Sequence, residues 1–225
     1  MRAKSYYSIG LYPVLFAFGS VYLEAILKKR KAIIIPILAS IRVIVFILIA
    51  KFLMPVQSPS EIIANHDSYE KIGLLRWEDG KNHLLPQDFA DMVGWKEMAE
   101  KTLLAYELIP PAERENTLIL CDNYGETGAV NYFNRGKMPQ AYSFNTDYIF
   151  WMPKKKNIRN VVLVGDIPDQ DVIDLFTSVK LIGKVENEYA REKGATIYLL
   201  SGAFNDVSLR INKEATERIQ KFDIF

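Results

Sequence analysis

The stretch from Lys28 to Met54 reads KKRKAIIIPILASIRVIVFILIAKFLM, and it decides which class of fold the chain can adopt. A cluster of basic residues, Lys28 to Lys31, is followed by an apolar run from Ala32 to Met54 that only Arg42 and Lys51 interrupt. As a helix this run is roughly 30 Å long or more, which matches the hydrocarbon core of a bilayer. The run therefore predicts a transmembrane helix.

A second apolar run, Ser8 to Leu27, precedes the basic cluster and contains one charge, Glu24. It is longer than the apolar core of a signal peptide, which has about 7–15 residues, and it ends in Lys-Lys-Arg-Lys without a small-residue cleavage site. A hairpin of buried soluble helices would need a polar stripe, for which the second run leaves almost no room. We therefore expect a transmembrane helical hairpin over residues 1–57.

The basic cluster also predicts the orientation of this hairpin. Cytoplasmic loops carry an excess of Lys and Arg, so Lys28 to Lys31 should face the cytoplasm and both ends of the hairpin should lie outside. Arg2 and Lys4 place positive charge on the outer side and count against this orientation, but the cluster of four is tighter. We expect a multi-pass protein of the inner (cell) membrane with an extracytoplasmic C-terminal domain. Arg42, ten residues inside the second span, implies further helices around it because an arginine in hydrocarbon is costly.

Residues 58–225 have the composition of a soluble domain, with charges throughout. Short apolar runs predict strands at Thr117–Cys121, Gln140–Phe144, Asn160–Val164, Lys180–Val185 and Thr196–Leu200. Helical spacing predicts helices at Ser60–Ile72, Pro86–Leu108 with a break at Gly94, Glu126–Phe133, Pro168–Phe176, and Asn212–Phe222 with Asn212 as its N-cap. The predicted fold is thus two transmembrane α-helices followed by an α/β domain with a largely parallel sheet.

Composition excludes several classes of function. The net charge is +1, so the chain has no basic footprint for nucleic acid. The single cysteine, Cys121, excludes an internal disulfide framework, and its place at the end of an apolar run indicates a core residue. His66 and His83 are the only histidines, and no Ser/His/Asp or Cys/His arrangement is evident. We expect no metal, no cofactor and no catalytic residue in this chain.

The segment Leu120 to Ala129, LCDNYGETGA, passes from a predicted strand into a predicted helix. Open α/β sheets bind ligands at the carboxyl ends of their strands, and helix N-terminal amides suit anions or hydroxyls. Asn123, Tyr124 and Glu126 are therefore candidate sugar-binding residues, with Asp122 beside them. The alternative is a capped turn in which Glu126 complements the helix dipole. No Gly-Lys-Ser/Thr follows, so the segment is not a P-loop.

The stretch from Tyr142 to Pro153 is rich in aromatic residues interleaved with polar ones, among them Asn145 and Tyr148. Such a pattern suits carbohydrate binding, contact with a membrane interface, or simple core packing. Lys154 to Lys156 follow directly, as a solvated turn or as a contact with lipid headgroups.

Several motifs resemble bacterial members of glycosyltransferase family 39, relatives of the dolichyl-phosphate-mannose protein mannosyltransferases and of the aminoarabinose transferase that modifies lipid A. The motifs are Lys4-Ser5-Tyr6-Tyr7, Leu11-Tyr12-Pro13, Leu15-Phe16-Ala17, Leu85-Pro86-Gln87-Asp88-Phe89-Ala90-Asp91 with Gly94-Trp95, and Asn123-Tyr124-Gly125-Glu126-Thr127-Gly128-Ala129. Family members often carry a His-Asn pair where this chain has Phe144-Asn145.

The resemblance implies a multi-span enzyme that moves a sugar from a polyprenyl-phosphate carrier to an extracytoplasmic acceptor. The family's catalytic carboxylate lies in an upstream loop that this sequence lacks, so the chain resembles the C-terminal portion and should be inactive alone. The Lys-x-Tyr-Tyr segment lies near the lipid-phosphate site in the family, which makes Lys4, Tyr6 and Tyr7 candidate substrate-binding residues. The implied partners are the polyprenyl-phosphate-linked sugar, membrane lipids, and the remaining transmembrane helices or a partner subunit. Two alternatives stay open: a membrane-tethered carbohydrate-binding or assembly module that partners a separate catalytic subunit, and an unrelated anchored α/β protein with a structural role.

Overall fold

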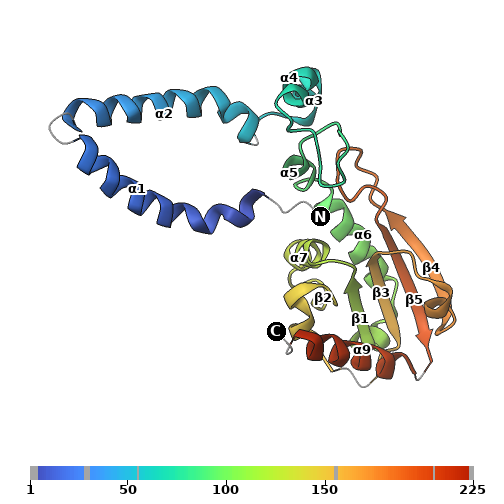
Figure 1. Cartoon of the computed structure of the whole chain (residues 1–225). Coiled ribbons are helices and arrows are strands. Elements are labelled where there is room, and N and C mark those ends of the chain that lie inside the picture. Colours follow the sequence, from blue (N-terminus) through green and yellow to red (C-terminus); the bar gives the residue numbers. More distant parts are fainter. Residues whose placement is uncertain (1–4, 28–30, 55, 155–156, 205, 223–225) are drawn as a thin grey trace. The chain divides into compact units, whose positions relative to one another are not determined.

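A computed structural model of the chain describes residues 5–27, 31–54, 56–154, 157–204 and 206–222 (Figure 1). The chain divides into two compact units, residues 1–89 and residues 90–225. The first unit holds the two apolar helices together with the segment from residue 58 to residue 89, and the second holds the sheet.

The first unit begins with a 3-10 helix, η1 (Ser5–Leu11), and two long helices, α1 (Tyr12–Leu27) and α2 (Lys31–Leu53). The segments Ser8–Leu27 and Ile33–Phe52 have 20 residues each and are long and apolar enough to cross a membrane. None of the most apolar part of either segment is buried in the structure. Arg42 is exposed on α2. Arg2, Lys4 and Lys28 to Arg30 lie outside the described residues.

The rest of the first unit is a small helical segment. The helix expected over Ser60–Ile72 is two short helices, α3 (Pro59–Ala64) and α4 (His66–Lys71), which meet at Asn65. A capping box between Ser58 and Glu61 starts α3, because each side chain bonds the other residue's backbone amide. α5 (Gln87–Ala90) follows a loop that contains one isolated bridge, between Arg76 and Asn82.

The second unit contains a mixed five-stranded sheet in the order β2-β1-β3-β5-β4. The strands are β1 (Thr117–Cys121), β2 (Ala141–Ser143), β3 (Asn160–Gly165), β4 (Phe176–Lys184) and β5 (Thr196–Ala203). β1 pairs in parallel with β2 and β3, whereas β5 is antiparallel to both β3 and β4. The largely parallel sheet that we expected is therefore present only in its β2-β1-β3 half.

The connections before and after β4 are both short, and the second one explains why β5 alone runs opposite to the other strands of the sheet. The predicted helix over Pro168–Phe176 is one turn, α8 (Gln170–Ile173), and β4 begins at Phe176 where the helix should have ended. β4 then returns to β5 through a loop over residues 185–195 that contains no helix. A parallel pairing needs a crossover of a dozen or more residues, usually helical, so this loop gives an antiparallel hairpin instead.

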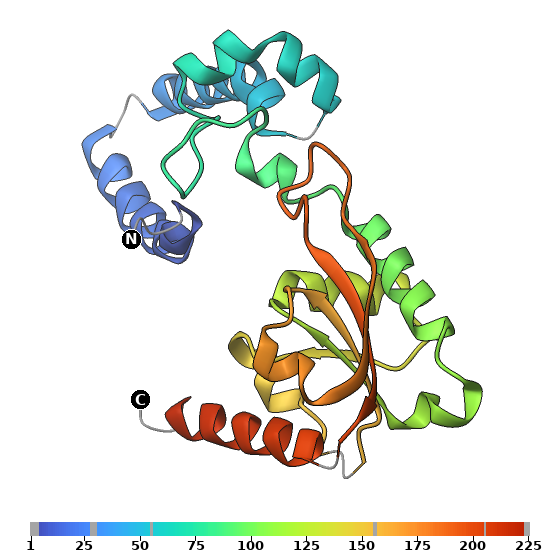
Figure 2. The same ribbon diagram turned by 90° about the vertical axis from the view of Figure 1, so that its right-hand side faces the viewer.

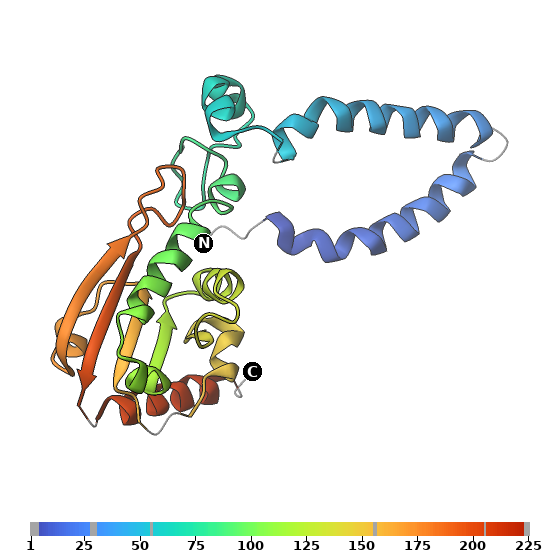
Figure 3. The same ribbon diagram turned by 180° about the vertical axis from the view of Figure 1, so that it is seen from behind.

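Helices cover both faces of the sheet (Figure 2). On one face, residues of α6 (Trp95–Glu107) and α7 (Tyr124–Phe133) form a core with β-strand residues such as Ile119 and Val162 (Figure 3). The break expected at Gly94 is confirmed, because Gly94 is the N-cap of α6 at φ +89°. On the other face, α9 (Asp206–Phe222) packs against Leu118 and Leu200 through Val207.

α9 corrects one prediction. It begins at Asp206, so Asn212 is an interior helical residue and not the N-cap. The preceding residues Val207 and Ser208 are buried, and the Ser208 hydroxyl accepts the Ile158 amide at 2.8 Å. Because this first turn is buried, the helix starts before Asn212, although an Asn often marks the start of a helix. Two 3-10 helices, η3 (Pro111–Asn116) and η4 (Thr146–Trp151), complete the unit.

Candidate functional site

The carboxyl ends of the three parallel strands meet at one edge of the sheet, where open α/β folds bind ligands. Asp122 and Asn123 follow β1, Asp166 follows β3, and Phe144 and Asn145 follow β2. Asp122 and Asp166 are exposed, and they are neighbours because β1 and β3 pair in register up to Cys121 and Val164. We refer to Asp122, Asn123 and Asp166 as the strand-end site.

A buried carboxylate closes the inner side of this site. Glu126, in the first turn of α7, is only 1% exposed. Its Oε2 accepts the amides of Asp122 at 3.1 Å and Asn123 at 3.4 Å, while its own amide donates to Asn123 Oδ1 at 3.0 Å. These bonds form a capping box, so the capped turn that we considered as the alternative for this segment is confirmed. Glu126 Oε2 occupies the amides of Asp122 and Asn123, so these two donors are not available to an external anion.

Several acids at this edge resist losing their protons. Burial, and then the charge of Glu192, raises the pKa of Glu126 to about 8. Asp166 is exposed at the surface but partly desolvated, and this desolvation, followed by the charge of Asp122 and a hydrogen bond with it, raises the pKa of Asp166 above its usual range. Burial likewise raises the pKa of Glu192. Asp122 and Asp166 are exposed acidic side chains that repel a phosphate and can hydrogen-bond hydroxyl groups, so this edge suits a neutral polyol better than a phosphate.

The remaining predicted residues of the second unit lie on neighbouring elements. Tyr124 is half exposed in the first turn of α7. The amide of Asn145 donates to Ser143 Oγ at 2.9 Å, and Ser143 Oγ donates to the Asp122 carbonyl at 3.0 Å, which links the ends of β2 and β1. Tyr148 belongs to η4 and forms an edge-to-face contact with Trp151. The structure thus brings Asn123 and Asn145 to the same edge.

Three predicted residues belong to the first unit. Lys4 lies outside the described residues. Tyr6 and Tyr7 fall in the 3-10 helix η1, but their side chains are also outside the described part of the chain. Their proposed contact with a lipid phosphate therefore stays a prediction.

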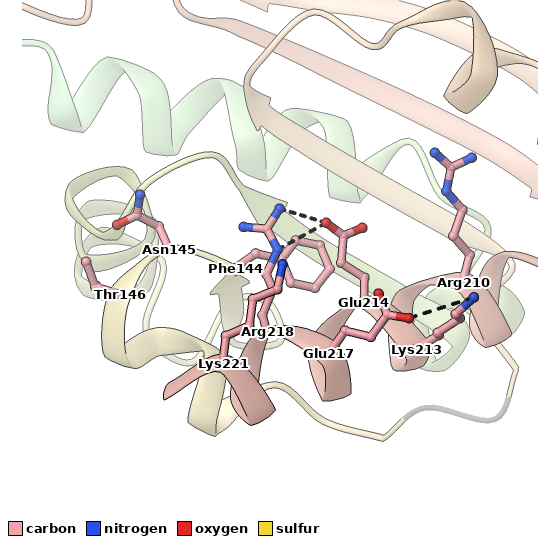
Figure 4. A pocket seen from close by; sticks show the side chains of 9 residues that line it. All are labelled: Phe144, Asn145, Thr146, Arg210, Lys213, Glu214, Glu217, Arg218 and Lys221. Atoms are coloured by element: carbon pink, nitrogen blue, oxygen red, sulfur yellow. Dashed lines mark hydrogen bonds and ion pairs between the residues drawn. The ribbon is translucent and has the colours of Figure 1, made fainter. Parts of the chain in front are cut away.

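Two adjoining hollows lie on the side of the sheet that α9 covers. The larger, about 800 Å³, runs between α9 and the residues that follow β2 (Figure 4). The smaller, about 200 Å³, reaches Asp166 between the sheet and α9. Both are lined by Phe144, Arg210 and Glu214. One signal in the sequence could have indicated the larger hollow, because its charged residues recur at helical spacing along α9: Arg210, Lys213, Glu214, Glu217, Arg218 and Lys221.

Cys121 and His83, two side chains that are often reactive in other proteins, are engaged in the packing of the fold. Cys121 is buried, and burial holds the pKa of its thiol far above the usual range, which confirms it as a core residue. His83 stacks on Trp77 and contacts Asp79 at 2.9 Å. Within the described residues, no group of three or more His, Cys, Asp or Glu side chains is arranged to hold a metal ion.

Comparison of the chain with protein-family models, with curated proteins and with solved structures finds no match. The resemblance to glycosyltransferase family 39 therefore rests on the motifs quoted above, and the function is argued from the site.

Proposed function

We propose that the chain works as the membrane-anchored, C-terminal portion of a glycosyltransferase that takes a sugar from a polyprenyl-phosphate carrier to an extracytoplasmic acceptor. In this proposal α1 and α2 cross the inner membrane, the basic segment between them faces the cytoplasm, and the α/β unit lies outside. The length and apolar surface of the two helices support the anchor. The proposal assigns the catalytic carboxylate to another part of the enzyme or to a partner subunit.

One observation carries the assignment of a carbohydrate ligand to the α/β unit. Carboxyl and amide groups of Asp122, Asn123 and Asp166 converge at the carboxyl ends of adjacent parallel strands, and two of these groups are exposed acids. Carboxyl and amide groups together recognise neighbouring hydroxyls, because a carboxylate accepts a hydrogen bond from a hydroxyl and an amide can both donate and accept. The proposed role of the strand-end site is to hold the sugar or the acceptor near the membrane surface.

Saturation-transfer NMR on the full chain in lipid nanodiscs tests this role. Mannose and glucose should receive saturation from the protein, and Asp122→Asn should weaken the signal because it removes one ionisable carboxyl from the strand-end site. Glu100→Gln is the matched control, since Glu100 is an exposed acid on α6. Equal signals from the two variants, or no transfer to either sugar, would exclude the strand-end site as the carbohydrate site.

A second candidate is a tethered carbohydrate-binding module that partners a separate catalytic subunit. The burial of Glu126, whose carboxyl bonds the amides of Asp122 and Asn123 and so is engaged in the fold, suits such a binding module as well as a non-catalytic portion of an enzyme. A general base must reach the proton it removes, which a capped and buried carboxyl does not. Co-purification of the chain with a separate multi-span membrane protein would favour the binding module. A gene that encodes the chain and such a protein as one continuous reading frame would favour the single enzyme.

A further inference from the structure

The groove between α9 and the residues after β2 has a charge pattern unlike that of the strand-end site. One face of α9 supplies its charged lining: Arg210, Lys213, Glu214, Glu217, Arg218 and Lys221. Four of these side chains are cationic and two are anionic, so the groove carries an excess of positive charge. Phe144, Asn145 and Thr146 form the opposite wall (Figure 4).

Arg218 is held in a fixed orientation within this groove. Its Nε and Nη2 atoms donate to Glu214 Oε1 at 3.1 and 2.7 Å, and its guanidinium carbon lies 5.1 Å from the centre of the Phe144 ring. The carboxylate fixes one edge of the guanidinium and the aromatic ring fixes its plane. A guanidinium held in this way loses little conformational freedom when it binds a planar or tetrahedral oxyanion through its other donors.

The opposite wall contains an unusual backbone conformation. Thr146 has φ +49°, and among the described residues it is the sole non-glycine residue with a positive φ. A β-branched residue seldom adopts this region, and such residues cluster at binding sites where the surrounding structure holds them. The wall is anchored on both sides, since the Asn145 amide bonds Ser143 Oγ and Ile149 of η4 is buried. The groove therefore has one wall with a constrained backbone and one with a fixed guanidinium.

The charge balance indicates the ligand. Glu214 is engaged by Arg218, and Glu217 lies 3.8 Å from Lys213, so each carboxylate of the groove already has a cationic partner. Arg210 and Lys221 supply the excess positive charge. We propose that this groove binds the oxyanion of a phosphorylated sugar, with the Arg218 guanidinium as the main contact and the adjoining hollow beside Asp166 accepting the ring hydroxyls. This site adjoins the strand-end site at Asp166, but its anion contact on α9 does not depend on the glycosyltransferase role.

The test is binding of glucose 1-phosphate to the full chain in nanodiscs of zwitterionic lipid, measured by calorimetry. Arg218→Lys keeps the charge and the spacing to Glu214 but removes the planar fork, so affinity should fall about tenfold, or about 1.4 kcal/mol. Lys180→Ala is the control, because it removes one exposed cation from β4, outside the groove, and should leave affinity unchanged. Thermal unfolding of both variants checks that the fold is retained.

Three outcomes overturn the proposal: no binding of glucose 1-phosphate, equal effects of Arg218→Lys and Lys180→Ala, or equal affinity for glucose and glucose 1-phosphate. A parallel titration with inorganic phosphate separates the sources of the anion. If phosphate binds as tightly as glucose 1-phosphate, the groove recognises the anion alone and the sugar part of the proposal is wrong. Asp122→Asn should leave the effect of Arg218→Lys on glucose 1-phosphate affinity unchanged. A negative result for the groove is therefore distinct from a negative result for the strand-end site.

Discussion

Gly165 lies directly against the carboxylate of Glu126, at a backbone φ of +98°. A Cβ added at residue 165 would fall 2.7 Å from Glu126 Cδ, closer than real Cβ contacts allow. The end of β3 and the first turn of α7 are therefore fitted to each other through a glycine and a buried acid that stand 39 positions apart in the sequence. Two predictions concern this contact.

Replacement of Gly165 by alanine should destabilise the α/β unit by about 2 kcal/mol or more. The methyl group collides with the Glu126 carboxyl, and an alanine at positive φ is itself strained by about 1–3 kcal/mol. Urea unfolding of the detergent-solubilised chain, followed by tryptophan fluorescence, measures the change. Gly194→Ala is the matched control, because Gly194 has φ +92° with no atom within 4 Å of the added Cβ. An equal loss in both variants would show that the collision with Glu126 contributes nothing.

The stability of the Glu126→Gln variant relative to the parent protein should increase progressively as the pH rises. The pKa of Glu126 is raised to about 8 in the fold from an ordinary value of 4.5, so the neutral form is the one that the fold favours. The stability that this preference supplies is fully present below pH 4.5 and is lost as the pH rises through 8. Glutamine is neutral throughout and keeps an acceptor for the amides of Asp122 and Asn123.

The difference in unfolding free energy between Glu126→Gln and the parent should thus grow by up to a few kcal/mol between pH 5 and pH 9. Asp166 and Glu192, whose pKa values are also raised, remain in both proteins, so the difference reports the titration of Glu126 together with its coupling to Glu192. Urea unfolding at pH 5, 7 and 9 provides the measurement. A difference that stays constant across this range would mean that Glu126 is ionised in the fold.

Local patterns predicted the elements better than their pairing. The β1 and β3 strands follow from short apolar runs, and the break at Gly94 follows from the conformational freedom of glycine. The reversed direction of β5 did not follow, because the loop between β4 and β5 contains no helix and forms an antiparallel hairpin. Whether a short apolar segment continues a crossover or turns back depends on tertiary packing.

For the candidate sites too, some features could be predicted from local sequence patterns and others could not. The strand-end position of Asn123 could be predicted, because a strand followed by a helix places it there. The burial of Glu126 could not, since it depends on the distant Gly165. The groove also joins distant parts of the chain, Phe144 after β2 and Arg218 on α9, and the spacing of charges on α9 alone gives a solvated helix face as readily as a binding wall.

Arg42 gives a prediction for the apolar helices. It is exposed on α2 within a segment apolar enough to cross a membrane, so an isolated chain leaves its guanidinium facing lipid or detergent. Arg42→Leu should stabilise the isolated chain in detergent by about 2 kcal/mol or more, the scale of placing an arginine at a helix centre in the membrane. Lys51→Leu is the control and should gain less, because Lys51 lies in the last turn of α2 and can reach the interface. Thermal unfolding in detergent compares them, and a loss of stability in Arg42→Leu would indicate a partner for Arg42 within this chain.

The orientation of the chain is tested by cysteine labelling in intact cells. The basic segment from Lys28 to Lys31 should stay on the cytoplasmic side, since moving four cations across the bilayer is unfavourable and loops rich in Lys and Arg are retained inside. Cysteines are placed at Lys154, which is exposed in the α/β unit, and at Lys29, which lies outside the described residues. The native Cys121 gives little background because it is buried and its thiol has a raised pKa.

A membrane-impermeant maleimide should label the Lys154→Cys variant and leave Lys29→Cys unlabelled until the cells are opened. The reverse pattern would place the α/β unit in the cytoplasm and remove the basis for an extracytoplasmic acceptor, whereas labelling at neither position before lysis would mean that the chain does not cross the membrane as proposed.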